Sequence, residues 1–251
     1  MLLRRAAQLL LTLPLLLLGS GATFADIKTV QLHVVDFPPY IIVPDTQDGI
    51  TGMDIDIVQA AFAAADLDVH FSSTPWKRII KSMERGTILG TVSCSRRPER
   101  LEYMLFSDEV TSTNRVAVSR SEVDTSAIQT LDDLQNFSVV SIEGWGMEQQ
   151  LTAENIPHET TSTYEGAMMA MRYRNIDILY AAEYPSLYYA RKLGIHRDIK
   201  ITPIRTEPVT PLYLCMSKTY PDSRAIMDRF NAGLRQIKQD GTYQAIRAKY
   251  L

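Results

Sequence analysis

Apolar positions alternate along short segments of this chain and recur at helical spacing along longer ones. Val30–Val35 alternates and is rich in β-branched residues, which predicts a first strand ending at a pair of prolines. Residues 53–65 carry apolar side chains every three or four positions and two acids in the first turn, which predicts a helix. This order of strand and helix continues through the sequence. It indicates an α/β fold with mixed, mostly parallel sheets flanked by helices.

The second half of the chain repeats the alternation of the first. Residues 88–93 predict a strand and residues 98–104 a helix, and a polar stretch follows at 121–130. The pattern then restarts with a strand at 138–142 and a Gly144-Trp145-Gly146 turn that opens a helix. This restart indicates two lobes.

The first 25 residues have the organisation of a secretory signal. Arg4 and Arg5 precede an apolar stretch at 9–18, and small residues end at Ala25. The apolar stretch is about half of the roughly 20 residues that a bilayer span needs. We therefore expect a signal peptide at 1–25, cleaved after Ala25, and a periplasmic protein.

Removing the expected signal changes the charge of the chain. Arg4 and Arg5 are lost and no acid is, so the formal net charge moves from −3 to −5. A mildly acidic chain without basic runs argues against nucleic acid or an anionic membrane as the partner.

The cysteines and histidines predict no metal site. Export permits a disulfide between Cys94 and Cys215, but the sequence leaves open whether they pair. The four histidines are scattered without metal-ligand spacing, so we expect no metal, and nothing predicts a cofactor.

Several motifs carry a family resemblance. The segment from Pro98-Glu99-Arg100 to Phe106-Ser107-Asp108 resembles the signature of bacterial extracellular solute-binding proteins of family 3, which bind polar amino acids. Three further features agree in order and spacing, namely Gly52–Asp56, Asn175–Asp177, and Phe230–Leu234 followed by Asp240–Tyr243. The resemblance spans about 30–250.

The resemblance implies a two-lobed fold of the type II periplasmic-binding-protein kind. Two chain crossings would join the lobes and the ligand would lie between them. Mapped onto this sequence, lobe one is 26–117 with 212–251, and lobe two is 118–211.

The resemblance also implies a carboxylate site in lobe one. Arg100 would grip the ligand carboxylate through its forked guanidinium, which suits a planar carboxylate better than lysine does. Ser93, Cys94 and Ser95 end the preceding strand and would offer backbone N–H groups and hydroxyls to the same carboxylate. The alternatives are a solvated helix-surface arginine, as for Arg96 and Arg97, and ordinary strand-end polarity.

Aromatic residues and a glycine turn complete the implied site. Phe37 and Trp76 would sandwich the apolar part of the ligand, and Gly144 with Trp145 would bring lobe-two backbone N–H groups to it. Core packing of the rings and a simple tight turn remain the alternatives.

One position departs from the family pattern. Ala182 stands where relatives usually have an aspartate for the ligand's ammonium, and Glu183 follows it. Either Glu183 substitutes for that aspartate, or the ligand is not an α-amino acid.

The sequence thus predicts a monomeric, non-enzymatic binding protein. It would capture an amino acid or related carboxylate for an inner-membrane ABC permease. Two alternatives are an exported enzyme resembling cyclohexadienyl dehydratase, for which Glu183 is the one candidate general acid, and a ligand-loaded sensor module that docks on a membrane receptor.

Overall fold

The computed structural model of the protein describes residues 28–46 and 49–250. The predicted signal peptide lies outside the described residues. Within them, no helix combines the length and apolarity that crossing a bilayer requires.

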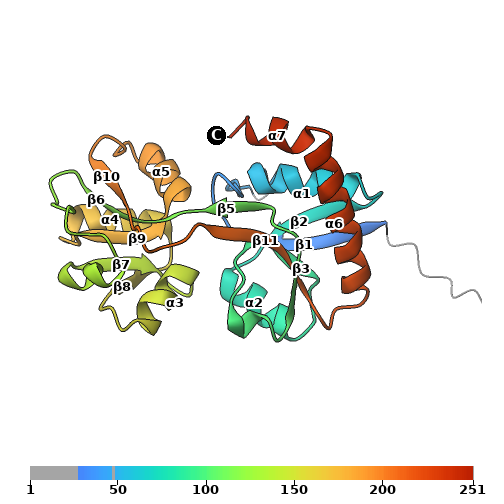
Figure 1. Cartoon of the computed structure of the whole chain (residues 1–251), viewed down its shortest axis with the longest axis horizontal. Helices are drawn as coiled ribbons and strands as arrows, with labels where there is room; N and C mark the ends of the chain where they lie inside the picture. The colour runs from blue at the N-terminus through green and yellow to red at the C-terminus, as the bar shows by residue number, and fades with distance from the viewer. Residues whose placement is uncertain (1–27, 47–48, 251) are drawn as a thin grey trace, which may run out of the picture.

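One lobe, called lobe one here, contains both ends of the described chain (Figure 1). Its sheet has the order β2-β1-β3-β11-β4, and β5 also pairs with β11. Helices α1, α6 and α7 pack together, and the rings of Phe62 and Phe230 join α1 to α6 at 4.9 Å. The elements are β1 Thr29–Val34, α1 Met53–Ala63, β2 Asp68–Ser73, α2 Trp76–Glu84, β3 Gly90–Cys94, β4 Met104–Phe106, β5 Thr111–Thr113, β11 Thr210–Ser217, α6 Ser223–Gln239 and α7 Thr242–Arg247.

The middle of the chain builds the other lobe, called lobe two (Figure 1). Its five-stranded sheet has the order β10-β6-β9-β7-β8. The elements are β6 Arg115–Arg120, a 3-10 helix Asp132–Asn136, β7 Val139–Ile142, α3 Gly146–Ala153, β8 Glu159–Thr161, α4 Tyr164–Tyr173, β9 Ile178–Ala182, α5 Glu183–Lys192 and β10 Ile199–Pro203.

Both sheets are mixed, and whether two strands pair parallel or antiparallel depends on how the chain connects them. The parallel pairs are β1–β2, β1–β3, β7–β8 and β7–β9, whose strands are joined through helices. Every antiparallel pair includes β6 or β11. The sequence-based expectation of mostly parallel sheets therefore holds for the pairs of helix-linked strands, but not for β6 and β11, the strands that begin directly after the two crossings.

The chain crosses between the lobes twice. Asn114 alone separates β5 from β6, whereas residues 204–209 separate β10 from β11. The crossings meet where Thr113 pairs with Thr210 in an antiparallel register. The lobe boundaries expected from the sequence, at 117/118 and 211/212, remain a prediction.

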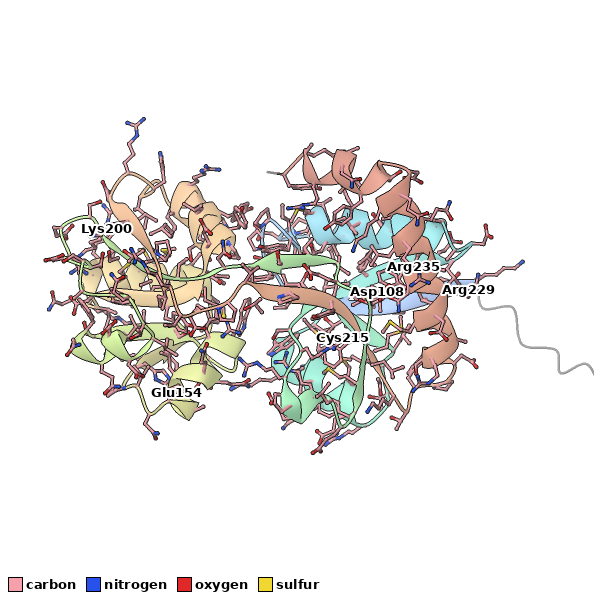
Figure 2. All side chains as sticks on the ribbon, viewed as in Figure 1. Asp108, Glu154, Lys200, Cys215, Arg229 and Arg235 are labelled. Atoms are coloured by element: carbon pink, nitrogen blue, oxygen red, sulfur yellow. A yellow bond between two sulfur atoms is a disulfide. The ribbon has the colours of Figure 1, made fainter. Side chains whose placement is uncertain are left out.

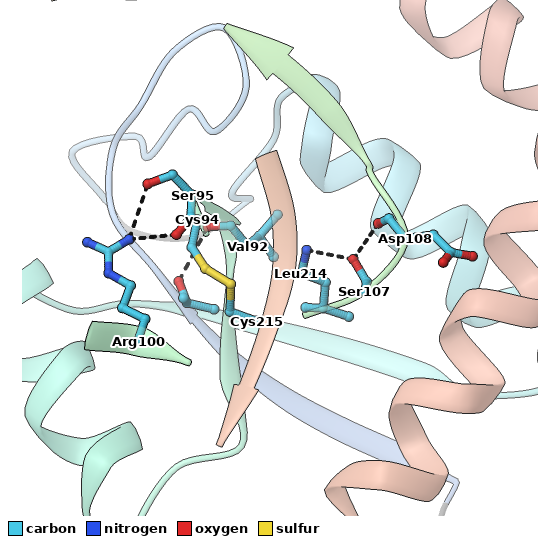
Figure 3. The surroundings of a disulfide bond; sticks show 9 residues. Val92, Cys94, Ser95, Arg100, Ser107, Asp108, Leu214 and Cys215 are labelled. Carbon is cyan, nitrogen blue, oxygen red and sulfur yellow. Dashed lines mark hydrogen bonds between the residues drawn. A yellow bond between two sulfur atoms is a disulfide. The ribbon is translucent and has the colours of Figure 1, made fainter. Parts of the chain in front are cut away.

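Two of the motifs behind the resemblance fasten lobe one together. The Ser107 hydroxyl accepts a bond from the Leu214 N–H at 3.0 Å and donates to the Asp108 carbonyl at 2.6 Å (Figure 3). The Asp108 N–H donates to Asn231 Oδ1 at 2.8 Å, and the Asp108 carboxylate pairs with Arg235 at 2.9 Å (Figure 2). These motif residues therefore tie α6 to the strand region beside β11.

The helix expected at 98–104 is shorter than predicted. The structure has a 3-10 helix over Pro98–Arg100, and a strand begins at Met104. Met104–Phe106 pairs with β11, so the chain must leave the helix early to rejoin the sheet. As a result Arg100 lies in a short connection between two strands of lobe one.

Candidate ligand-binding site between the lobes

A cavity lies between the lobes, and both of them contribute to its wall. Lobe one supplies Phe37, Trp76, Ser93, Cys94, Ser95 and Arg100, among others. Lobe two supplies Trp145, Gly146 and Met147, and the crossing region supplies Thr113, Arg115, Thr210 and Leu212. The described residues that line this cavity include two arginines and no aspartate or glutamate.

Arg100 is the buried cation of this wall. Its side chain is only 4% exposed, and one guanidinium nitrogen donates to the Ser95 carbonyl at 3.0 Å and the Ser95 hydroxyl at 3.3 Å (Figure 3). The guanidinium also lies 5.1 Å from the centre of the Trp76 ring. Burial, and then the charge of Arg97, lower its pKa to about 10, so it stays charged at neutral pH. No carboxylate of the described residues forms an ion pair with it.

Hydrogen bonds to Asp54 fix the end of β3, the strand that precedes Arg100. Ser93 adopts a left-handed backbone conformation (φ 57°), and its hydroxyl donates to Asp54 Oδ2 at 2.5 Å. The Thr111 hydroxyl donates to the other Asp54 oxygen at 2.8 Å. The Ser93 and Ser95 hydroxyls are thus engaged within the protein, by Asp54 and Arg100 respectively. This arrangement fixes the backbone between them beside the cavity.

Cys94 forms a disulfide with Cys215, which settles the pairing that the sequence left open. The bond joins β3 to β11 (Figure 3), and Cys94 itself lines the cavity. A ligand in the cavity would therefore contact a covalently fixed part of the sheet.

The buried Asp54, which accepts the bonds from Ser93 and Thr111, makes the stability of the fold depend on pH. The carboxyl is fully buried in the first turn of α1, and burial raises its pKa to about 7, although the bonds from Ser93 and Thr111 oppose the shift. Between the ordinary value of 3.8 and about 7, the folded chain holds a proton that the unfolded chain releases. This contribution to stability is full below pH 4 and is lost as the pH rises through 7.

We therefore expect Asp54→Asn to flatten the pH dependence of the unfolding free energy. From pH 4 to pH 7, the wild type should lose up to roughly 4 kcal/mol that the variant does not lose. Urea denaturation at several pH values measures this difference. Asp56 is a partly exposed acid in the same helical turn. Asp56→Asn is therefore the matched control and should keep the wild-type slope. Equal slopes for Asp54→Asn and wild type would contradict the assignment.

The predicted aromatic residues meet across the cleft. Phe37 stacks on Tyr40 at 5.0 Å and meets the edge of Trp145 from lobe two at 5.3 Å. Phe37 is 6% exposed, so it belongs both to the core and to the cavity wall. The two readings of this ring from sequence, ligand contact and core packing, are therefore compatible.

Three predicted site residues lie outside the cavity wall. The Gly144 N–H donates to the Glu148 carboxylate at 3.0 Å, and the turn instead brings Gly146 to the wall. Ala182 is fully buried at the end of β9. The Glu183 carboxylate accepts a bond from the Asn114 amide at 2.8 Å, in the first crossing.

Several functional candidates escaped the sequence reading. Arg97, read there as a solvated residue, is half-buried and donates to the Gly146 carbonyl across the cleft. Arg115, Thr113 and Thr210 line the cavity from the crossing strands. For Arg115 the sequence did contain a signal, because a charged residue precedes three apolar neighbours in a segment predicted to be extended.

Other contacts close the cleft at its rim. The Tyr189 hydroxyl of lobe two donates to the Asp36 carboxylate of lobe one. Lys77 at the start of α2 pairs with Glu143 of lobe two at 2.6 Å. Both Lys77 and Glu143 are largely exposed, so this ion pair contributes little free energy. The Asp36–Tyr189 bond is partly buried and is the stronger link between the lobes.

Comparison with known proteins places this geometry in a family. A model of the bacterial extracellular solute-binding proteins, family 3, matches residues 32–251. The chain is 23% identical over 246 residues to the arginine-binding periplasmic protein of Mannheimia haemolytica, which covers 96% of this chain and 98% of that protein.

Solved structures show the same fold at low sequence identity. A histidine kinase sensor domain with similarity to periplasmic binding proteins matches at a TM-score of 0.80 and 20% identity, covering 90% of this chain and 96% of that one. The ancestral amino acid-binding protein AncCDT-1, a precursor of cyclohexadienyl dehydratase, matches at a TM-score of 0.73 and 21% identity, covering 88% and 94%.

These matches confirm the resemblance inferred from the motifs and the two-lobed type II fold that it implied. The family match begins within β1 and covers the rest of both sheets, both crossings and the residues that line the cavity. The chain belongs to family 3 of the bacterial extracellular solute-binding proteins.

Proposed function

We propose that this protein captures a small carboxylate between its two lobes in the periplasm and presents it to an inner-membrane ABC permease. The observation that carries the proposal is Arg100. It is a buried guanidinium with no ion-pair partner among the described residues, and it faces a cavity with aromatic walls. A carboxylate ligand would supply the missing negative charge through two parallel hydrogen bonds.

The placement of Arg100 suits binding by closure. Lobe one holds the cation, while lobe two brings Trp145 and Met147 to the opposite wall. Moving the lobes together removes water from the cavity, and the lower dielectric strengthens each polar contact with the ligand. The Asp36–Tyr189 bond and the reach of Arg97 to Gly146 favour the closed arrangement.

The groups around the cavity favour capture over conversion. A dehydratase needs a general acid beside its substrate. Glu183, the acid that the sequence offered for this role, is bonded to Asn114 away from the described cavity wall. Cys94 is held in a disulfide and is not a free nucleophile. These placements give the enzymatic alternative less support than binding.

Export and delivery complete the proposal. The expected signal peptide at 1–25 would direct the chain to the periplasm, where the relative from Mannheimia haemolytica is named as residing. We propose that the mature chain acts there as a monomer.

The proposal is tested by ligand-induced closure. The mature chain (26–251) is screened by thermal shift against mono- and dicarboxylates, 2-oxo and 2-hydroxy acids, and amino acids. A ligand at a hundredfold its Kd should stabilise the fold by about 2.7 kcal/mol. Small-angle scattering with that ligand should show a smaller radius of gyration. Saturable binding without compaction, or no binding by any carboxylate, would overturn the proposal.

A closure variant sharpens the test. Tyr189→Phe removes the inter-lobe bond to Asp36 and leaves the Arg100 cavity untouched, so it should raise the ligand Kd about fivefold, which corresponds to roughly 1 kcal/mol. Tyr188→Phe, whose ring packs on that of Tyr189, is the matched control. An unchanged Kd in Tyr189→Phe would mean that this bond takes no part in closure.

A further inference from the structure

The arginines at the cavity are not all neutralised by carboxylates. Arg115 is balanced, because it pairs with the buried Glu207 carboxylate at 3.0 Å. Arg100 has no such partner among the described residues, and Arg97 has only the exposed Glu99 at 3.9 Å. The cavity therefore carries an excess of positive charge before a ligand enters. A bound carboxylate restores neutrality, whereas a zwitterion brings its own cation into the same space.

An α-ammonium group would find no free carboxylate on the described wall. Glu207 is engaged by both Arg115 and the Gln150 amide, the latter at 2.9 Å. Asp54 lies behind the wall and is covered by the Ser93 and Thr111 hydroxyls. The face of Trp76, which could otherwise attract a cation, is already taken by Arg100. An ammonium would also be repelled by the nearby guanidinium in a medium of low dielectric.

Among the unpartnered polar groups of the wall residues, Arg115 Nε can bond only to an acceptor such as a ligand oxygen, and the Thr113 and Thr210 hydroxyls can bond to one as well. Arg115 Nε and Thr210 Oγ1 are buried and have no hydrogen-bond partner among the described residues, although both residues line the cavity. Burying such groups without a partner costs free energy that a matching ligand atom would recover. An N–H can only donate, so the atom that satisfies Arg115 Nε must be an acceptor. A keto or hydroxyl oxygen is an acceptor, and an ammonium is not.

Apart from the Thr113 hydroxyl, the side chains next to these polar groups are mostly apolar. Val35, Phe37, Ile41, Met147 and Leu212 surround the space next to these polar groups. Such a wall favours a hydrocarbon or aromatic body on the ligand, because apolar surface is removed from water on both sides of the contact.

We infer that the ligand is a carboxylic acid with an apolar body and an α-oxo or α-hydroxyl group in place of an α-ammonium. The inference rests on the proposed function and specifies its ligand class. The carboxylate would bind Arg100, and the α-oxygen would lie against Arg115 Nε and the Thr210 hydroxyl.

Matched ligands that differ only at the α-carbon test the inference. Isothermal titration of the mature chain compares phenylalanine, phenylpyruvate and phenyllactate, and then leucine, 4-methyl-2-oxopentanoate and 2-hydroxy-4-methylpentanoate. We expect the oxo or hydroxy acid of at least one series to bind at least tenfold more tightly than its amino acid. An amino acid that binds as tightly as its analogues, with closure, would overturn this inference and leave the proposed function standing. If no carboxylate of these series or of the wider screen binds, both fall.

A side-chain variant tests the α-oxygen contact itself. Thr210→Val keeps the shape of the residue and removes its hydroxyl. It should weaken binding of phenyllactate or phenylpyruvate about five- to tenfold and leave 3-phenylpropionate, which has no α-substituent, unchanged. Ser119→Ala is the matched control, because it removes another buried, unpartnered hydroxyl that does not line the cavity. Equal losses for the substituted and unsubstituted acids, or no loss at all, would contradict the contact.

Discussion

Arg100→Met is expected to abolish carboxylate binding while leaving the unliganded protein at least as stable as wild type. Methionine fills the stem of the arginine but cannot bind a carboxylate. Loss of the charge-assisted bonds costs about 3 kcal/mol, so the Kd should rise more than 100-fold. Removing a buried charge that has no ion-pair partner relieves its desolvation, which offsets the lost bonds to Ser95. Titration with the tightest carboxylate of the screen and urea denaturation without ligand measure the two effects.

The neighbouring Arg96 provides the matched control. Its guanidinium lies over the rings of Phe106 and Tyr213, at 5.2 and 5.0 Å, and Arg96 is absent from the described cavity wall. Arg96→Met should leave the Kd unchanged. The reverse outcome for Arg100→Met, a destabilised protein that still binds carboxylate normally, would assign Arg100 a structural role.

Removing the disulfide by Cys94→Ala with Cys215→Ala should lower the free energy of unfolding by about 2–5 kcal/mol. The two cysteines are 121 residues apart, and the closed loop contains all of lobe two. A crosslink over so long a loop restricts the unfolded chain strongly, although native-state effects modify the gain. Urea denaturation of the oxidised wild type and of the double variant measures the difference.

Reduction separates the crosslink from the change of side chain. Dithiothreitol should shift the wild-type urea midpoint toward that of the double variant and should leave the double variant unaffected. A thiol assay on the denatured, unreduced wild type should find no free thiol. Two free thiols and a midpoint insensitive to reductant would contradict a structural disulfide.

The fold could be predicted from local patterns and from motifs that resemble a family signature, and the structure shows the physical reasons. Strand alternation and helix spacing are set by which face of each element is buried, so they can be read one segment at a time. The Phe-Ser-Asp segment and the Asn231 segment bond to one another, so their joint presence indicated one packing arrangement. In α6, a side chain at Gly233 would approach the Ala61 carbonyl to 1.9 Å, which explains a glycine there.

The cavity was only partly predictable. Arg100 and Trp76 were found because a motif and a helix start marked them, and both line the cavity. Arg97 and Thr210 were missed because their importance depends on segments far away in the chain. Arg97 reaches Gly146 across the cleft, and Thr210 meets Thr113 only when the two crossings pair. No local pattern encodes such meetings.

The single residue between β5 and β6 limits how the lobes can move. The Glu183 N–H donates to the Asn114 carbonyl at 3.0 Å, and the Glu183 carboxylate accepts from its side chain, so Asn114 is fastened to the start of α5. On one side it continues a strand of one sheet, and on the other a strand of the second. The two backbone torsions of this one residue then connect the two sheets in the first crossing. Opening would follow a narrow arc rather than a free swivel, so the protein would return Trp145 to the same place opposite Arg100 each time the lobes come together.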